Sequence, residues 1–458
     1  MVNYSCEICN KIFKQKYHYN QHQKRKIKCN NNDEKLKNII NKVIDNKNNL
    51  FSKKIELNIF NNITNNNNNN MIVGMNNNEI VNKDEIIVPI QVKKNKKLSK
   101  KLSKQILGQF YTTNQEYILQ GMKIPDNIKN IIEPFTGNGD LITFIETQQE
   151  QNNVKYIIEC YDIEPKKDYI IQQDTINNPP NYNNKYLITN PPYLARNKSQ
   201  DKLLFDKYDV NDLYKCVIKD ILTNICLGGI LIIPLNFWSS IRIADIELRK
   251  AFLEKYNVIL LNIFEEQVFD DTSYTICSFQ FEWRDILYNA LDSKSLNELN
   301  IIIYPSKTII KTELNDDNNY MIGGDIYNLK LKNTYKITRL TKKNILKSNT
   351  NILVKCIDDN INNQIGLSFV KDKDIYVDNT PNQTARTYAT LIIEPKIEID
   401  KQKELIIKFN KYLKEYREKY NSLFLTNYRE SKDIARKRIS FDLVYSIIGY
   451  ILENFDDF

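Results

Sequence analysis

The residues best suited to chemistry are Asn190-Pro191-Pro192-Tyr193, which directly follow the apolar stretch 185–189. In open α/β sheets, ligands bind outside the carboxyl ends of the strands, so a reactive group is expected at such a position. Two successive prolines fix the backbone and remove two N–H donors. The side-chain oxygen of Asn190 and a backbone carbonyl are then free to accept hydrogen bonds from an amino group.

The exocyclic amine of adenine is a nucleophile that needs two such acceptors. Its lone pair is conjugated with the ring. Acceptors placed on its two hydrogens favour a pyramidal nitrogen and offset the developing positive charge. Tyr193 can stack on the same base. Taken alone, the tetrapeptide is also compatible with a Pro-Pro turn that only ends a strand.

A nucleotide site is indicated upstream, where the apolar stretch 131–133 runs into a turn that contains Gly137 and Gly139. Glycines allow positive φ and a close approach of the backbone to a ligand. The chain has too few glycines here for the dinucleotide fingerprint, and Asp140 would repel a pyrophosphate. A nucleotide without a phosphate linker, such as S-adenosylmethionine, fits better.

Two acidic residues end the next two candidate strands. Asp162 can accept hydrogen bonds from both hydroxyls of a ribose, as in nucleotide-binding sheets generally. Asp174 can accept a hydrogen bond from the adenine amine of the cofactor. Each acid alone also fits a solvated surface residue. Their order, with one at each strand end, favours a binding site.

From about residue 105, short apolar runs alternate with helical stretches, which is the pattern of an α/β sheet. The predicted strands are 129–133, 154–161, 186–189, 230–235, 258–264 and 275–282. The predicted helices include 140–149, 210–226 and 243–256. The alternation weakens beyond residue 290, and the last segment of the chain is predicted to be largely helical.

The order of these motifs resembles that of the gamma-class adenine DNA methyltransferases of restriction–modification systems. Residues 108–113 match the leading Gly-Gln-Phe/Tyr-x-Thr element of that family. The cofactor motifs, Asn-Pro-Pro-Tyr and then Asp212-Leu213-Tyr214 follow in the family's order, so that the match covers roughly residues 105–285. The chain departs from the family pattern at Thr113, where proline is frequent, and at Phe135, which is bulkier than usual.

The resemblance implies an α/β fold, a Rossmann-like methyltransferase with a seven-stranded mixed sheet. It also implies transfer of a methyl group from S-adenosylmethionine to the N6 amine of an adenine flipped out of double-stranded DNA. Asn190 and the Pro191 carbonyl would hold the amine, while the other target-base residues would be Pro192, Tyr193 and Tyr274. The two tyrosines would stack on opposite faces of the base. The cofactor residues implied are Thr112, Glu133, Pro134, Gly137, Gly139, Asp162 and Asp174.

The first 30 residues contain a spacing of Cys6, Cys9, His22 and Cys29 that suits a tetrahedral zinc ion. They resemble a zinc finger of the two-Cys, two-His type whose last ligand is a cysteine, with His18 as an unused or alternative ligand. A unit of this size cannot hold a core without metal. We therefore expect a structural zinc. Whether the finger binds DNA, RNA or protein stays open.

The predicted organisation is a zinc finger, an Asn/Lys-rich disordered linker, a catalytic domain, a target-recognition domain and a helical segment, at 1–30, 31–104, 105–290, 291–400 and 401–458. The first 107 residues hold 21 of the 65 basic residues but only 8 of the 56 acidic ones. This basic arm fits attraction to DNA phosphates, and it fits a solvated linker equally well. Residues 384–387, which include Arg386, and the basic residues Arg429, Arg436, Lys437 and Arg438 fit contacts to phosphates or bases, and they fit ordinary surface charge equally well.

No apolar run approaches the length of a membrane span, and the N-terminus lacks a signal-peptide pattern. The scattered cysteines beyond residue 100 suit buried thiols and a reducing compartment. We expect an intracellular monomer of the cytoplasm or nucleus that binds double-stranded DNA and no membrane. A separate cognate restriction endonuclease is a further expected partner. Two other functions stay open: methylation of RNA or of a protein glutamine, and DNA binding through the finger without catalysis.

Overall fold

The computed structural model describes residues 4–5, 12–13, 20, 112–269, 274–284, 298–357, 364–378, 387–431 and 434–457. The chain forms two units, Met1–Val88 and Pro89–Phe458. In the first unit, the described strands β1 (Tyr4–Ser5) and β2 (Ile12–Phe13) pair in antiparallel fashion. The four expected zinc ligands and the expected linker lie outside the described residues, so the zinc finger stays a prediction.

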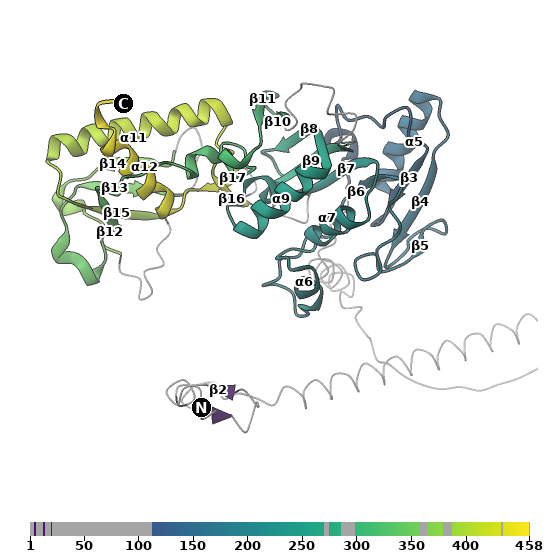
Figure 1. The fold of residues 1–458 in the computed structure, drawn as a ribbon, viewed down its shortest axis with the longest axis horizontal. Helices are drawn as coiled ribbons and strands as arrows, with labels where there is room; N and C mark the ends of the chain where they lie inside the picture. Colours follow the sequence, from purple (N-terminus) through teal and green to yellow (C-terminus); the bar gives the residue numbers. More distant parts are fainter. Residues whose placement is uncertain are drawn as a thin grey trace, which may run out of the picture. The chain divides into compact units, whose positions relative to one another are not determined.

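The second unit contains a nine-stranded mixed sheet in the order β11-β10-β8-β9-β7-β6-β3-β4-β5 (Figure 1). Strands β5, β4, β3, β6 and β7 are parallel to one another, whereas β9 is antiparallel to both β7 and β8. The α/β class and the mixed sheet are thus confirmed. The strands are β3 (Asn130–Glu133), β4 (Ile157–Asp162), β5 (Ile171–Gln172), β6 (Tyr186–Thr189), β7 (Gly228–Pro234), β8 (Tyr256–Phe264), β9 (Ile276–Trp283), β10 (Glu298–Tyr304) and β11 (Thr308–Glu313).

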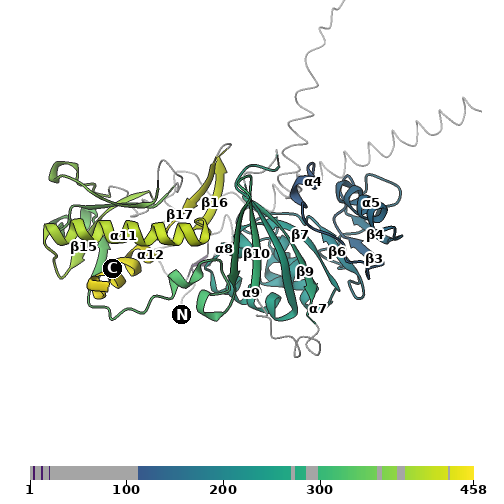
Figure 2. The same ribbon diagram turned by 90° about the horizontal axis from the view of Figure 1, so that it is seen from above.

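Helices cover both faces of this sheet, which is why its central strands are continuous apolar runs. Every residue of β6 and β7 is buried. Helices α4 and α5 lie on one face and α7 and α9 on the other (Figure 2). The helices of this part are α4 (Gln115–Ile118), α5 (Asp140–Asn152), α6 (Leu203–Tyr208), α7 (Tyr214–Thr223), α8 (Asn236–Ser239) and α9 (Ile243–Lys255).

The sheet has two more strands than the seven expected. Strand β10 pairs with β8 in parallel, and β11 pairs with β10 in antiparallel fashion. Both strands follow residue 290, where the sequence predicts the boundary of the catalytic domain. Two buried isoleucines of β10, Ile301 and Ile303, join the same core as the central strands. The sheet therefore extends to Glu313.

A separate four-stranded antiparallel sheet follows, in the order β12-β15-β13-β14, and the helices α11 and α12 pack against it (Figure 1). The described residues also form five short 3-10 helices: η1 (Asp316–Asn318), η2 (Gly324–Tyr327), η3 (Lys342–Lys347), η4 (Asp372–Asp374) and η5 (Phe455–Asp457). The strands and helices are β12 (Lys336–Arg339), β13 (Ile352–Lys355), β14 (Gly366–Phe369), β15 (Tyr388–Glu394), α11 (Ile399–Tyr420) and α12 (Phe441–Glu453).

The helical segment predicted for 401–458 is interrupted by a hairpin of β16 (Thr426–Ser431) and β17 (Ile434–Arg438). Its strands are rich in arginine and carry little of the apolar alternation that identifies a strand. The hairpin is held to the large sheet by Lys437, whose ammonium lies 2.9 Å from Glu265 at the end of β8. The Asn421 amide donates a hydrogen bond to the same carboxylate.

The five cysteines in the described part of the chain, Cys160, Cys216, Cys226, Cys277 and Cys356, are free and buried. No helix among the described residues is both long and apolar enough to cross a membrane.

Candidate active site

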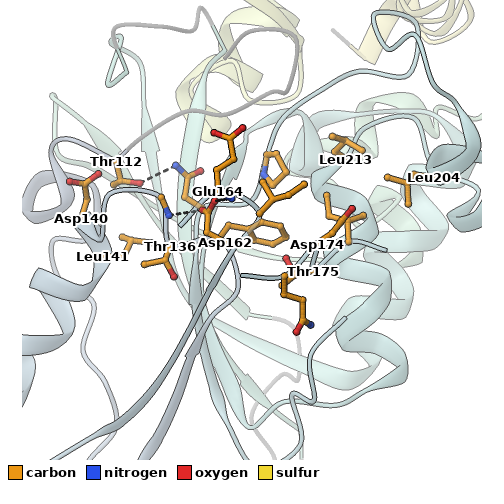
Figure 3. A pocket seen from close by; sticks show the side chains of 17 residues that line it. Thr112, Thr136, Asp140, Leu141, Asp162, Glu164, Asp174, Thr175, Leu204 and Leu213 are labelled. Carbon is orange, nitrogen blue, oxygen red and sulfur yellow. Dashed lines mark hydrogen bonds between the residues drawn. The ribbon is translucent and has the colours of Figure 1, made fainter. Parts of the chain in front are cut away.

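A cavity of about 340 Å³ opens at the carboxyl ends of β3, β4 and β6 (Figure 3). Its size falls within the range of small-molecule sites. Thr112 and Asp140 lie toward one side of the cavity in Figure 3, and Asp174 and Leu213 toward the other, with Asp162 between them. The lining residues are Thr112, Phe135, Thr136, Gly137, Asp140, Leu141, Asp162, Ile163, Glu164, Gln173, Asp174, Thr175, Ile176, Asn190, Pro192, Leu204 and Leu213.

The glycine turn after β3 forms one wall of the cavity. Gly137 and Gly139 both have positive φ, 55° and 85°. A Cβ at Gly139 would lie 2.7 Å from the Tyr169 hydroxyl, so only glycine fits there without a shift of that side chain. The Gly137 N–H donates to Asp162 Oδ2 at 2.8 Å. The turn is thereby tied to the end of the neighbouring strand.

Asp162 lines the cavity, but both of its carboxylate oxygens already accept backbone hydrogen bonds. Oδ2 accepts from Gly137, and Oδ1 accepts from the Glu164 N–H at 2.8 Å. A carboxylate oxygen can accept more than one hydrogen bond, so the ribose role predicted for Asp162 is compatible with these contacts. Glu164 lines the same cavity with a side chain that is 62% exposed and that pairs with Lys166. Sequence reasoning missed this second acid.

Asp174 lies beside the apolar part of the cavity. Its carboxylate accepts hydrogen bonds from the Asn177 backbone N–H at 3.1 Å and from the Asn177 side-chain amide at 2.7 Å. The residues around it offer a planar ring an apolar surface. Sequence reasoning did not predict an apolar wall from these residues, which are Phe135, Ile163, Ile176, Leu204 and Leu213.

Of the predicted cofactor residues, Glu133, Pro134 and Gly139 do not line the cavity. The Glu133 side chain is 1% exposed, and its Oε1 accepts from the Thr189 hydroxyl at 2.6 Å and from the Phe135 N–H at 3.0 Å. Its Oε2 is buried and has no hydrogen-bond partner among the described residues. Burial raises the pKa of this carboxyl to about 8. The Pro134 carbonyl accepts from the Thr175 hydroxyl at 2.9 Å.

Asn190 lines the cavity at the end of β6, as the sequence predicts for a residue that directly follows this strand. Its side chain is 8% exposed. The Nδ2 atom donates to the Thr112 hydroxyl at 3.0 Å, and the Oδ1 atom accepts from the Tyr193 hydroxyl. These two contacts fix which way the amide faces. Pro192 lines the cavity as well, whereas Pro191 is buried beside it.

Tyr193 and Tyr274 do not line the cavity. Tyr193 is 2% exposed, and its ring packs edge-to-face on Tyr214 at 6.3 Å between centroids. Its hydroxyl also contacts the Ile232 carbonyl at 2.6 Å. The stacking role predicted for Tyr193 therefore requires its ring to leave this packing. Tyr274 is half-buried, and the Lys198 ammonium lies 5.5 Å from its ring centroid.

No family model and no curated protein sequence matches the chain. Among solved structures, it is similar to a modification subunit of a putative type I restriction enzyme from Vibrio vulnificus. The identity is 11% and the TM-score 0.31, over 46% of this chain and 50% of that chain.

Two further solved structures are similar to a comparable degree. A putative class I S-adenosylmethionine-dependent methyltransferase from Listeria monocytogenes is 16% identical with a TM-score of 0.31, over 42% of this chain and 62% of that chain. The methyltransferase subunit of a type I restriction–modification system from Streptococcus thermophilus is 12% identical with a TM-score of 0.33, over 45% of this chain and 51% of that chain. In all three comparisons the chain spans less than two thirds of the other protein.

Proposed function

We propose that this chain is an S-adenosylmethionine-dependent methyltransferase that methylates the N6 amine of adenine in double-stranded DNA. The observation that carries the proposal is the position of Asn190. Asn190 lines the same cavity as Gly137, Asp162 and Asp174, so a residue with an acceptor for an amine lies beside a site suited to a nucleoside. These groups lie at the carboxyl ends of four neighbouring parallel strands, β6, β3, β4 and β5.

The cavity fits the cofactor that the proposal requires. Asp162 and Glu164 offer carboxylates to ribose hydroxyls, and Asp174 lies beside an apolar wall that suits an adenine ring. The Oε2 of Glu133, which has no partner among the described residues, is a buried polar atom next to the glycine turn, and such atoms usually have a partner. S-adenosylmethionine, when bound, supplies a methyl group on a sulfonium that an amine can attack in line.

The chain's own residues then hold and orient the amine. Asn190 Oδ1 and the Pro191 carbonyl accept from its two hydrogens, which makes the nitrogen lone pair more available. Oδ1 now accepts from Tyr193, so a Tyr193 ring that turns onto the base both releases this acceptor and provides the stacking surface. The target base must leave the helix, at a cost of a few kcal/mol.

No histidine base is needed in this scheme. Both histidines of the chain, His18 and His22, precede the catalytic region. The amine proton becomes acidic only after the methyl group has been transferred, so it can then pass to solvent. Catalysis is largely by positioning of the two reactants.

The proposal is tested by comparing methyl transfer from one labelled cofactor to three substrates. Purified full-length chain is incubated with labelled S-adenosylmethionine and unmethylated duplex DNA, total RNA or a denatured protein mixture. The proposal predicts label in DNA, recovered as N6-methyladenine after digestion to nucleosides. If the label appears in RNA or in protein glutamine instead, that molecule and not DNA is the substrate. If no substrate is labelled, the proposal is refuted.

A further inference from the structure

The 3-10 helix η3 of the C-terminal sheet presents two adjacent apolar side chains to solvent. Leu346 is 99% exposed and its neighbour Ile345 is 50% exposed. Single exposed apolar residues are ordinary, but an adjacent pair at the tip of one turn is a candidate contact site. The turn connects β12 to β13, which are the neighbours of β15 on its two sides.

Hydrogen bonds to strand β15 hold the turn at both of its ends. Before it, the Leu340 N–H donates to the Thr390 carbonyl of β15 at 2.7 Å. After it, the Asn349 amide donates to the Ile393 carbonyl of β15 at 2.6 Å and accepts from the Ile393 N–H at 3.1 Å. A turn held in this way presents its apolar tip without a large loss of conformational entropy on binding.

A side chain within the turn closes it further. Asn344 Oδ1 accepts from the Thr341 N–H at 2.6 Å, and its Nδ2 donates to the Arg339 carbonyl at 3.1 Å. The apolar tip is therefore carried by a closed hydrogen-bonded turn.

The charge around the tip is positive. Residues 339–347 contain Arg339, Lys342, Lys343 and Lys347 and no acid. Arg339 lies 3.7 Å from Asp378, and Lys347 lies 3.6 Å from Glu394. Lys342 and Lys343 are exposed and form no ion pair with the residues that the structure describes. An apolar tip flanked by these two lysines is complementary to a ligand with negative charges on its outside and apolar groups inside, such as stacked bases between phosphate backbones.

We propose that η3 is a DNA wedge, in which Leu346 enters a base step of the duplex while Lys342 and Lys343 contact the flanking phosphates. The inference rests on the proposed function only in taking DNA as the partner. Proteins that bend DNA insert apolar side chains of this kind between base pairs and kink the helix. The bend would bring more of the protein surface against the duplex.

The role of Leu346 is tested with the full-length chain and a short mixed-sequence DNA duplex, by measuring the affinity for the duplex and the bend in it. Leu346→Ala is expected to weaken binding about tenfold, the change that burial of one leucine side chain corresponds to. It should also reduce the bend, measured by energy transfer between dyes at the two duplex ends. The matched control is Ile407→Ala, because Ile407 is 67% exposed on α11 and has no part in the wedge.

The lysines are tested by the salt dependence of the same binding. Each phosphate contact contributes about 0.9 to the slope of log affinity against log salt, so the double variant Lys342→Ala, Lys343→Ala should lower this slope by about 2. The control removes Lys411 and Lys414, two exposed lysines of α11 that lie near Glu415 and Glu418. The control variant should keep the wild-type slope.

Unchanged affinity, bend and salt slope in the η3 variants would overturn the wedge even if the chain methylates DNA. Conversely, a chain that transfers no methyl group to DNA but loses affinity and bend in these variants would keep the wedge and lose the proposed function. A third result also overturns the wedge: Leu346→Ala abolishes self-association of the chain in sedimentation and leaves DNA binding unchanged. That result would identify the tip as a protein contact.

Discussion

At the residue scale, two of the buried polar side chains at the proposed site are Asn190 and Glu133. Asn190 has its amide fixed by Thr112 on one side and Tyr193 on the other. Glu133 has one satisfied carboxyl oxygen and one without a partner among the described residues. Burial of such groups costs free energy unless they are hydrogen-bonded or neutral. We therefore expect their hydrogen bonding or protonation to change when a ligand binds.

The raised pKa of Glu133 predicts a pH-dependent stability. The ordinary pKa of a glutamate is 4.5, and burial raises the pKa of Glu133 to about 8, so the folded state binds a proton that the unfolded state has lost. The stability that this proton provides is complete below pH 4.5 and is lost as the pH rises to about 8. Glu133→Gln cannot titrate, and its melting temperature should fall less over this range.

Melting curves of the ligand-free chain between these pH values check the prediction. Glu146→Gln, at an exposed position of α5, is the matched control and should follow the wild type. Parallel curves for wild type and Glu133→Gln would mean that the buried carboxyl is already ionised.

The Tyr193 ring and its hydroxyl have separable roles. If the ring stacks on the target base, Tyr193→Phe should retain most of the methylation rate. Tyr193→Ala should lose about 10- to 100-fold, since stacking contributes about 1–3 kcal/mol per base. Cofactor affinity, measured by calorimetry, shows whether each variant keeps its cavity. Equal losses in the two variants would assign the role to the hydroxyl and contradict stacking.

Sequence reasoning identified those cavity-lining residues that belong to local motifs. Gly137, Asp162, Asp174 and Asn190 each follow or end a predicted strand, and all of them line the cavity. The apolar wall was not predictable, because Leu204 and its neighbours come from separate segments with no shared spacing. The burial of Tyr193 was not predictable either, since it depends on a ring contact with a tyrosine of α7.

At the scale of elements, Arg249 of α9 holds the loop after β7 in place. Its side chain is fully buried, and its guanidinium donates to the carbonyls of Phe237 and Ser240 at 2.8 Å each. It also donates to the carbonyls of Asn319 and Tyr320, at 3.1 and 2.9 Å, in the segment that follows β11. One cation thus joins three segments of the chain.

Arg249→Met should destabilise the fold strongly. The variant leaves four carbonyls without this donor, and because each unsatisfied buried acceptor costs about 1–3 kcal/mol, we expect a loss of about 3 kcal/mol or more in the free energy of unfolding. Chemical denaturation of the ligand-free chain measures the change. The control is Arg242→Met, because Arg242 is exposed just before α9. If Arg249→Met lowers the free energy of unfolding by less than about 1 kcal/mol, water replaces the guanidinium as the donor to these carbonyls.

The elements themselves were predicted where apolar periodicity is clear. Strand β6 has the predicted bounds, and α5 and α9 begin at the predicted residues. The hairpin of β16 and β17 was missed because charged residues dominate its sequence. Strand β10 was missed because residues 298–304 lie in a region where the overall alternation is weak, although their burial alternates once they pair with β8.

At the scale of the whole molecule, the chain combines two units of different character. The unit from Pro89 onward holds the large sheet and the cavity, whereas the expected zinc ligands belong to the unit before it. The predicted boundaries at residues 30 and 104 stay predictions, since they lie outside the described residues. A metal measurement tests the N-terminal assignment independently of catalysis.

The purified chain is expected to contain one zinc ion per molecule by elemental analysis. His22→Ala should lose the zinc, because a ligand is removed, while methylation by the second unit need not change. His18→Ala is the matched control and should retain the metal. If His22→Ala retains zinc and His18→Ala loses it, His18 and not His22 is the zinc ligand. A wild-type chain without zinc would refute the predicted zinc finger.

In the proposed mechanism, the Asn190 amide presents the target amine of DNA for methylation, and the methylation yield of an Asn190 variant reports on this role. N6-methyladenine is quantified in DNA after incubation with S-adenosylmethionine and either the wild type or Asn190→Ala. Asn183→Ala, an exposed position before β6, is the control. We predict a loss of about 100- to 1,000-fold for Asn190→Ala, with cofactor affinity retained and the control unchanged. Wild-type levels of N6-methyladenine with the Asn190 variant would show that this amide does not hold the target amine.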